Sequence, residues 1–219
     1  MPRNDQGQKV LLPATYPPYL FRGQSKRHVP CFPSMYRHIK TMPQYMWKVS
    51  EADAMRIVAD AARTLWYYSE LERHPIFQWA KANRLYLPEL ELAQHYGIPT
   101  ALLDLSESIE VALFFATHEF KDGMFHPCTS GTGILYMVDR TRVPKGLVSR
   151  FISVASQPFL RPLSQWAWTC ELLMGECFED CPSLGAIEFE HYVAGFLWFL
   201  FLCVSVLCLA ASSIAWDKP

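Results

Sequence analysis

Two short segments of the sequence combine residue types that bind phosphate groups or support acid and base chemistry. The first is Tyr19-Leu-Phe-Arg-Gly-Gln-Ser25, which places Arg22 at the end of a short apolar stretch and beside Gly23. An arginine can donate two parallel hydrogen bonds to phosphate oxygens, and a glycine lets a ligand approach the backbone. The segment predicts a site for a phosphate-bearing ligand that uses Arg22, Gly23 and Gln24; a solvated basic face is the alternative.

The second segment, residues 92–106, carries four polar candidates: His95, Thr100, Asp104 and Ser106. A helix is expected to end at Gly97, and a turn at Pro99 follows it. His95 could act as an acid or base, or it could close the helix C-terminus. Asp104 could bind a ligand, or it could cap the next helix.

The elements that would position these residues follow from hydrophobic spacing. Strands are expected at residues 19–21, 131–139 and 151–155, and helices at 50–72, 88–97 and 106–116. Ser50 is the expected N-cap of the longest helix, whose positions at helical spacing are Met55, Val58, Ala59, Ala62, Leu65, Trp66 and Ser69. The order of elements predicts an α+β fold in which a mixed sheet is flanked by helices.

Composition and charge exclude several classes of protein. Of 219 residues, 51% are hydrophobic and 19% are charged, which excludes an intrinsically disordered chain. The formal net charge of -1 lacks the basic excess of a nucleic-acid-binding protein, so no sequence-specific nucleic-acid binding is expected. The charge is uneven, because residues 1–50 carry eight Lys or Arg and only one acid, Asp5.

The cysteines indicate reduced thiols rather than a disulfide framework. There are seven, an odd number, and no two form a C-x-x-C pair. No metal site is expected, because no second pair of ligands has matching spacing. The N-terminus also lacks the apolar core of a signal peptide.

Residues 193–215 contain 23 residues without a charge. A helix of that length crosses the roughly 30 Å hydrocarbon layer of a bilayer, so we expect a single-pass C-terminal transmembrane helix; a buried central helix is the alternative. The expected organisation is an irregular segment at 1–18, one domain at 19–190 and the membrane helix. The body is expected on the cytoplasmic side, although the flanking charges leave the orientation open.

Both chemistry-bearing segments resemble signatures of the FRG domain, a bacterial and phage-associated family named for a Phe-Arg-Gly triplet. The triplet is Phe21, Arg22 and Gly23 here, and the second signature is similar to His95-Tyr-Gly-Ile-Pro-Thr-Ala-Leu-Leu-Asp104 followed by the helix at 111–116. The resemblance covers about residues 15–160. It implies a fold like that of the ADP-ribosyltransferases.

The same resemblance implies roles for individual residues. Arg22 would hold the phosphates of NAD, and Thr100 with Ser106 would line the nicotinamide pocket. A late acid, Glu171 or Glu176, would stabilise the positively charged sugar that forms when the nicotinamide bond breaks. The stretch at 169–178 departs from the family pattern, since its usual Arg and Gln are missing.

Two functions remain open at this stage. One is an NAD-binding or nucleotide-binding protein with ADP-ribosyltransferase-like activity. The other is a catalytically inactive FRG module that binds a partner at a membrane. The departure of residues 169–178 from the family pattern favours this second function. The sequence leaves the substrate, the partner and the oligomeric state undetermined.

Overall fold

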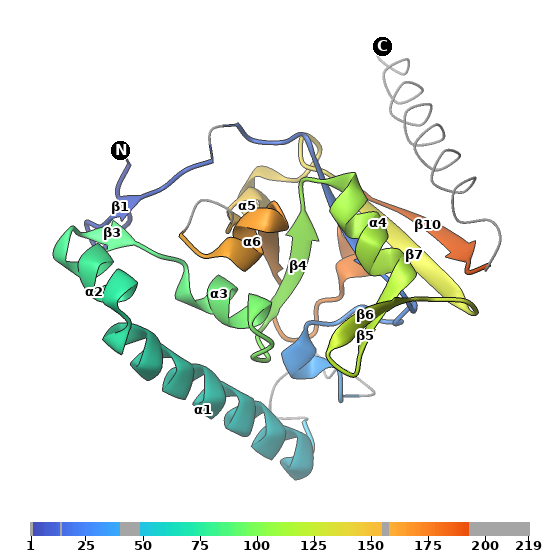
Figure 1. Ribbon diagram of the computed structural model, residues 1–219, viewed down its shortest axis with the longest axis horizontal. Helices are drawn as coiled ribbons and strands as arrows, with labels where there is room; N and C mark the ends of the chain where they lie inside the picture. Colours follow the sequence, from blue (N-terminus) through green and yellow to red (C-terminus); the bar gives the residue numbers. More distant parts are fainter. Residues whose placement is uncertain (1, 14, 40–48, 155–157, 193–219) are drawn as a thin grey trace.

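A six-stranded antiparallel sheet forms the centre of the structure, a computed structural model that describes residues 2–13, 15–39, 49–154 and 158–192 (Figure 1). The strand order is β10-β7-β2-β4-β9-β8. The strands are β2 (Tyr19–Gln24), β4 (Leu102–Ser106), β7 (Thr132–Asp139), β8 (Phe151–Ser153), β9 (Ala167–Glu171) and β10 (Leu184–Glu190). Every neighbouring pair in this sheet is antiparallel.

The fold is α+β, and the structure corrects the predicted fold class in two respects. The expected mixed sheet is wrong for the main sheet; parallel pairing occurs between β1 (Lys9–Val10) and β3 (Leu85–Tyr86) instead. Within the described ranges, no helix is long and apolar enough to cross a membrane. The longest helix there, α1 (Glu51–Arg73), has 23 residues but carries charges on successive turns. The expected transmembrane segment at 193–215 lies outside the described residues.

The main core lies on the sheet and is built from the central strands. Apolar side chains fill both faces of β7, as expected for its near-continuous apolar sequence. The three largest fully buried side chains of this core are Tyr136 of β7, Trp168 of β9 and Phe178, which begins the 3-10 helix η3 (Phe178–Asp180). The sheet is therefore a rigid base for the side chains that project from its strand ends.

Three elements surround one edge of β2 and β4. Helix α4 (Ile109–Thr117) begins at Ser108, whose hydroxyl accepts a hydrogen bond from the Val111 N–H, and it packs across β2. The hairpin of β5 (His118–Lys121) and β6 (Met124–Pro127) follows α4 directly. Helix α3 (Glu89–His95) precedes β4. The remaining short helices are η1 (Ser34–Tyr36), α2 (Pro75–Ala82), α5 (Lys145–Val148), α6 (Leu160–Ser164) and η3 (Phe178–Asp180).

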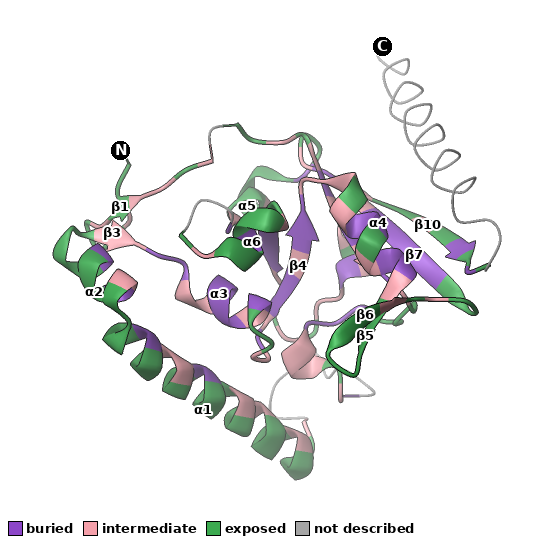
Figure 2. Cartoon of the chain, viewed as in Figure 1, coloured by how far each residue is buried: buried purple, intermediate pink, exposed green. Residues whose placement is uncertain are grey.

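Helix α1 begins at Ser50 as expected, where the Ser50 hydroxyl accepts from the Asp53 N–H. Its buried residues, Thr64 and Leu71, lie on the opposite side from most of the apolar positions that define the sequence pattern. Figure 2 shows the outer side of α1 as exposed along its length. The helix is thus correct in position, but its apolar face is turned outward.

Candidate functional site

The main sheet is nearly split between β2 and β4, and this split creates the candidate site. The two strands share one pair, Phe21 with Ser106, whereas β2 pairs along its whole length with β7. Beyond Phe21 the strands diverge, which leaves backbone groups of β4 without a strand partner. Arg22 fills part of the gap, because its Nη1 donates to the Asp104 carbonyl oxygen at 2.7 Å.

A cleft of about 700 Å³ opens at this split. Its walls come from β2, α3, β4, α4, the β5–β6 hairpin and the region of α6. Five of the residues expected to bind a ligand line this cleft: Arg22, Gly23, Gln24, Asp104 and Ser106. His95, an expected catalytic residue, lines it as well. The structure therefore brings the two sequence segments together in one concave site.

The cleft has an excess of positive charge. Its lining includes four permanent cations, Arg22, Lys26, Arg37 and Arg161, against the two carboxylates of Asp104 and Glu119. Partial desolvation and then the charge of Arg22 lower the pKa of Arg37, which reflects how close these cations lie. A group of cations with few counter-charges is suited to phosphate oxygens.

His95 and Asp104 face each other inside the cleft without a direct hydrogen bond. The His95 Nε2 and the Asp104 Oδ1 are 3.7 Å apart, and neither atom has a hydrogen-bond partner among the described residues. The other ring nitrogen, Nδ1, lies 3.1 Å from the Gln165 Oε1 and can donate to it. Burial lowers the pKa of His95, against the raising effect of Asp104, so the ring is neutral at neutral pH. With Nδ1 protonated, the His95 Nε2 and the Asp104 Oδ1 are both acceptors, so a ligand hydroxyl could donate to either of them.

Two other buried polar atoms of the cleft, the Arg22 Nε and the Gln24 Oε1, also lack a hydrogen-bond partner in the described part of the chain. Both side chains are more than nine-tenths buried. Buried polar groups in folded proteins are usually paired, so unpaired ones that share a cleft indicate where a ligand or water completes the site.

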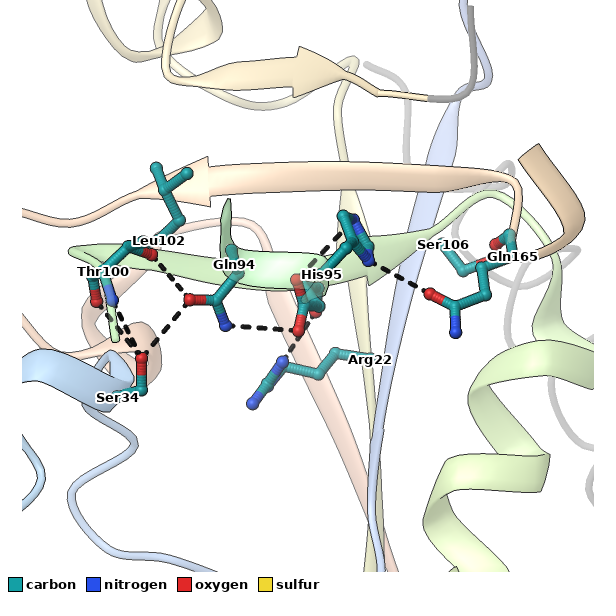
Figure 3. A network of polar contacts seen from close by, with 9 residues as sticks. Arg22, Ser34, Gln94, His95, Thr100, Leu102, Ser106 and Gln165 are labelled. Carbon is teal, nitrogen blue, oxygen red and sulfur yellow. Dashed lines mark hydrogen bonds and ion pairs between the residues drawn. The ribbon is translucent and has the colours of Figure 1, made fainter. Parts of the chain in front are cut away.

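Thr100 does not line the cleft, contrary to its expected role at the nicotinamide pocket. Its side chain is fully buried, and its hydroxyl donates to the Gln94 Oε1 at 2.6 Å. The Gln94 Nε2 in turn donates to the Asp104 Oδ2 at 3.3 Å. Figure 3 follows this chain of contacts from Thr100 through Gln94 towards Arg22 and His95. Thr100 therefore acts on the site by fixing Gln94.

Gly23 is required for packing rather than for ligand approach. A Cβ at this position would lie 1.7 Å from the Ala112 carbonyl oxygen and 2.6 Å from the Ala116 nitrogen. The space that the sequence analysis reserved for a ligand is therefore filled by α4.

The two expected late acids lie away from the cleft, since neither is among its lining residues. Glu176 pairs with Arg150 and accepts from the Leu173 N–H. Glu171 ends β9 opposite Leu102. Their side chains thus cannot serve a ligand bound beside Arg22 without a rearrangement.

Three aromatic side chains that no sequence motif indicates as site residues form an aromatic wall of the cleft. Phe115, Phe120 and Phe125 line it, and the rings of Phe120 and Phe125 lie 5.0 Å apart. Phe120 is 66% exposed and Phe125 is 40% exposed, so both rings present apolar surface to a ligand in the cleft. The basic excess before residue 50 includes Lys26 and Arg37 but does not single them out as cleft residues. No sequence pattern indicates that the β5–β6 hairpin contributes to the site.

Among the described residues, no three His, Cys, Asp or Glu side chains are grouped so that they could hold a metal ion. The site that the geometry does provide is made of arginine, lysine, histidine, carboxylate and aromatic groups.

Comparison with known proteins identifies the family. The FRG domain model matches residues 17–123, a range that includes β2, α3, β4, α4 and β5 and so most walls of the cleft. No curated protein and no solved structure matches the chain. On the match to its family model, residues 17–123 of this chain are an FRG domain.

Proposed function

We propose that this FRG domain binds a phosphate-bearing nucleotide in the cleft between β2 and β4, with NAD as the first ligand to test. The observation that carries the proposal is the convergence of Arg22, Lys26, Arg37 and Arg161 on one cleft that is also lined by the aromatic wall. Arginine and lysine bind phosphate oxygens, and aromatic rings stack on planar bases. A nucleotide is the ligand class that has both groups.

The contacts around His95 add a third feature to the proposed ligand. A sugar hydroxyl could donate to the His95 Nε2 or to the Asp104 Oδ1, two acceptors that lack partners. Phosphates at the cations, a hydroxyl at this pair and a base at Phe120 and Phe125 would use the parts of the cleft that protein atoms leave unsatisfied.

A ligand series tests the class of ligand. Calorimetric titration of the full chain with NAD, ADP, adenosine and pyrophosphate should give the tightest binding for the ligands that have both a base and phosphates. Binding should weaken as salt rises, because the cationic contacts are partly exposed. Equal affinity for pyrophosphate and NAD would show that the aromatic wall does not contribute to binding. The absence of binding for all four ligands would reject the proposal.

Arg22 is a poor position for a first test, because its guanidinium also holds the Asp104 carbonyl. Lys26 is exposed and lines the cleft, and its ammonium group makes no hydrogen bond or ion pair with the residues that the structure describes. Lys26→Gln should therefore weaken NAD binding without a loss of stability. Arg142→Gln is the matched control, since Arg142 is an exposed cation that does not line the cleft; equal effects of the two variants would argue against binding there.

ADP-ribosyltransferase-like catalysis is the second candidate, and the position of Asp104 favours testing it. With Glu171 and Glu176 elsewhere, Asp104 and Glu119 are the carboxylates of the cleft that could stabilise a positively charged sugar. Chromatography should detect nicotinamide released from NAD by the wild type but not by Asp104→Asn, whereas Glu176→Gln should retain the activity. Binding without any release of nicotinamide would leave a binding module.

A further inference from the structure

The outer side of α1 carries an apolar stripe that no described part of the protein covers. Met55, Val58, Leu65 and Trp66 are each more than 60% exposed. Met55, Ala62 and Trp66 project almost directly away from Thr64, the side chain by which α1 packs on the body, because successive helical residues turn by about 100°. A row of large apolar side chains at helical spacing is typical of a surface that packs against another helix.

One pair of large apolar residues and one pair of opposite charges in the stripe are placed symmetrically about Ala62, although Arg73 also pairs with Glu70 of its own helix at 3.1 Å. Val58 and Trp66 lie four residues to either side of Ala62. Glu51 and Arg73 lie eleven residues to either side, at the two ends of the helix and on the same face as the stripe. A second α1 in antiparallel orientation would therefore bring its Arg73 near Glu51 and its Val58 near Trp66.

We propose that α1 pairs in antiparallel orientation with α1 of a second copy of this chain, with the two-fold axis beside Ala62. Trp66 then packs on Val58 of the partner subunit, and Glu51 lies near Arg73 of the partner subunit. Ala62 faces its own counterpart, and its small side chain lets the two helices approach closely. Both charged pairs form only in this orientation, since a parallel pair would place Glu51 beside the same acid of the other copy.

A cysteine cross-link tests the position of the axis. In the full chain, Ala62→Cys should form a covalent dimer under mild oxidation, because two cysteines beside the axis come within disulfide distance. Ala61→Cys is the matched control: Ala61 is equally exposed but points about 100° away from the stripe. The wild type gives the background from the native cysteines. Cross-linking of Ala62→Cys that does not exceed that of Ala61→Cys overturns the proposal.

Charge reversal tests the orientation. Sedimentation of the full chain should show a larger dimer dissociation constant for Glu51→Arg and for Arg73→Glu, by severalfold each at low salt, and recovery in the double variant. Each single change also opposes the dipole of α1, and the double variant keeps both of those effects. Recovery therefore reports contact between copies and not helix stability. A double variant no tighter than the single ones, or a chain that is monomeric up to about 100 µM, contradicts the antiparallel dimer.

Discussion

Replacement of Gly23 by alanine should destabilise the protein severely, because the added methyl group has nowhere to go. Its Cβ would lie 1.7 Å from the Ala112 carbonyl oxygen, and Cβ contacts under 3.0 Å essentially never occur. The separation of β2 and α4 must therefore widen by about 1.3 Å, against backbone atoms rather than the end of a flexible side chain. The shift would loosen the small core in which Ala112 and Leu113 of α4 pack on Leu135.

The expected loss follows from what such overpacking costs elsewhere. Extra methyl groups in packed cores cost about 1–3 kcal/mol, and a rigid clash with backbone belongs at the upper end or above it. In a domain of this size, about 3 kcal/mol lowers the melting temperature by roughly 6–12 °C. This is a large part of the 5–15 kcal/mol that stabilises most domains.

Thermal and urea unfolding of the full chain measure the effect, with Gly185→Ala as the control. Gly185 lies on edge strand β10, where the nearest atom to an added Cβ would be 3.8 Å away, so the change should be small. A melting temperature of Gly23→Ala within a few degrees of that of Gly185→Ala would refute the packing role of Gly23. That result would favour the alternative, in which Gly23 lets a ligand approach the backbone.

Three further predictions concern buried side chains. In a urea titration, Thr100→Val should lower the free energy of unfolding by about 1–3 kcal/mol, because the Gln94 Oε1 loses the hydrogen bond that the Thr100 hydroxyl donates. Thr169→Val is the control: its hydroxyl is fully buried and has no hydrogen-bond partner among the described residues, so the change should be neutral or stabilising. Burial lowers the pKa of His95 below 6.5, so the unfolded chain takes up the proton more readily and the free energy of unfolding should fall as the pH drops below that value. Urea titrations across this pH range should give a shallower fall for His95→Asn than for the wild type. An identical fall in the two proteins would exclude His95 as the cause of the pH dependence. Burial raises the pKa of Cys170 to about 12, so mass spectrometry should find it unalkylated in the native protein and alkylated in urea, and rapid native alkylation would contradict its burial.

The elements that the sequence analysis predicts are those with strong local signals. The apolar run at Gly133–Val138 gives β7, and Ser50 begins α1 as expected. Strands β4, β9 and β10 were not predicted as strands. Strand β4 follows a turn and is defined by pairing with β9 more than 60 residues later, a contact that no local pattern contains. Strand β10 carries polar residues such as Glu188 on its exposed side.

The apolar face of α1 and the role of Gly23 illustrate a different limit. Spacing identifies which residues share a helix face, but it does not say what covers that face. A glycine beside an arginine is equally consistent with an approaching ligand and with an approaching helix, and only the position of Ala112 distinguishes them. Arg22, Gln24, His95, Asp104 and Ser106 were predicted for the site and do line it, because the two motifs that contain them flank the split in the sheet.

One titration tests most directly whether the cationic cleft binds a phosphate-bearing nucleotide. Calorimetry with NAD should give saturable binding to the full wild-type chain. Lys26→Gln should bind severalfold more weakly, since a charge-assisted hydrogen bond contributes about 1.5–3 kcal/mol, less at an exposed side chain, and each 1.4 kcal/mol is a factor of ten. Absence of saturable binding to the wild type, or equal affinity of the two proteins, would contradict this account of the cleft.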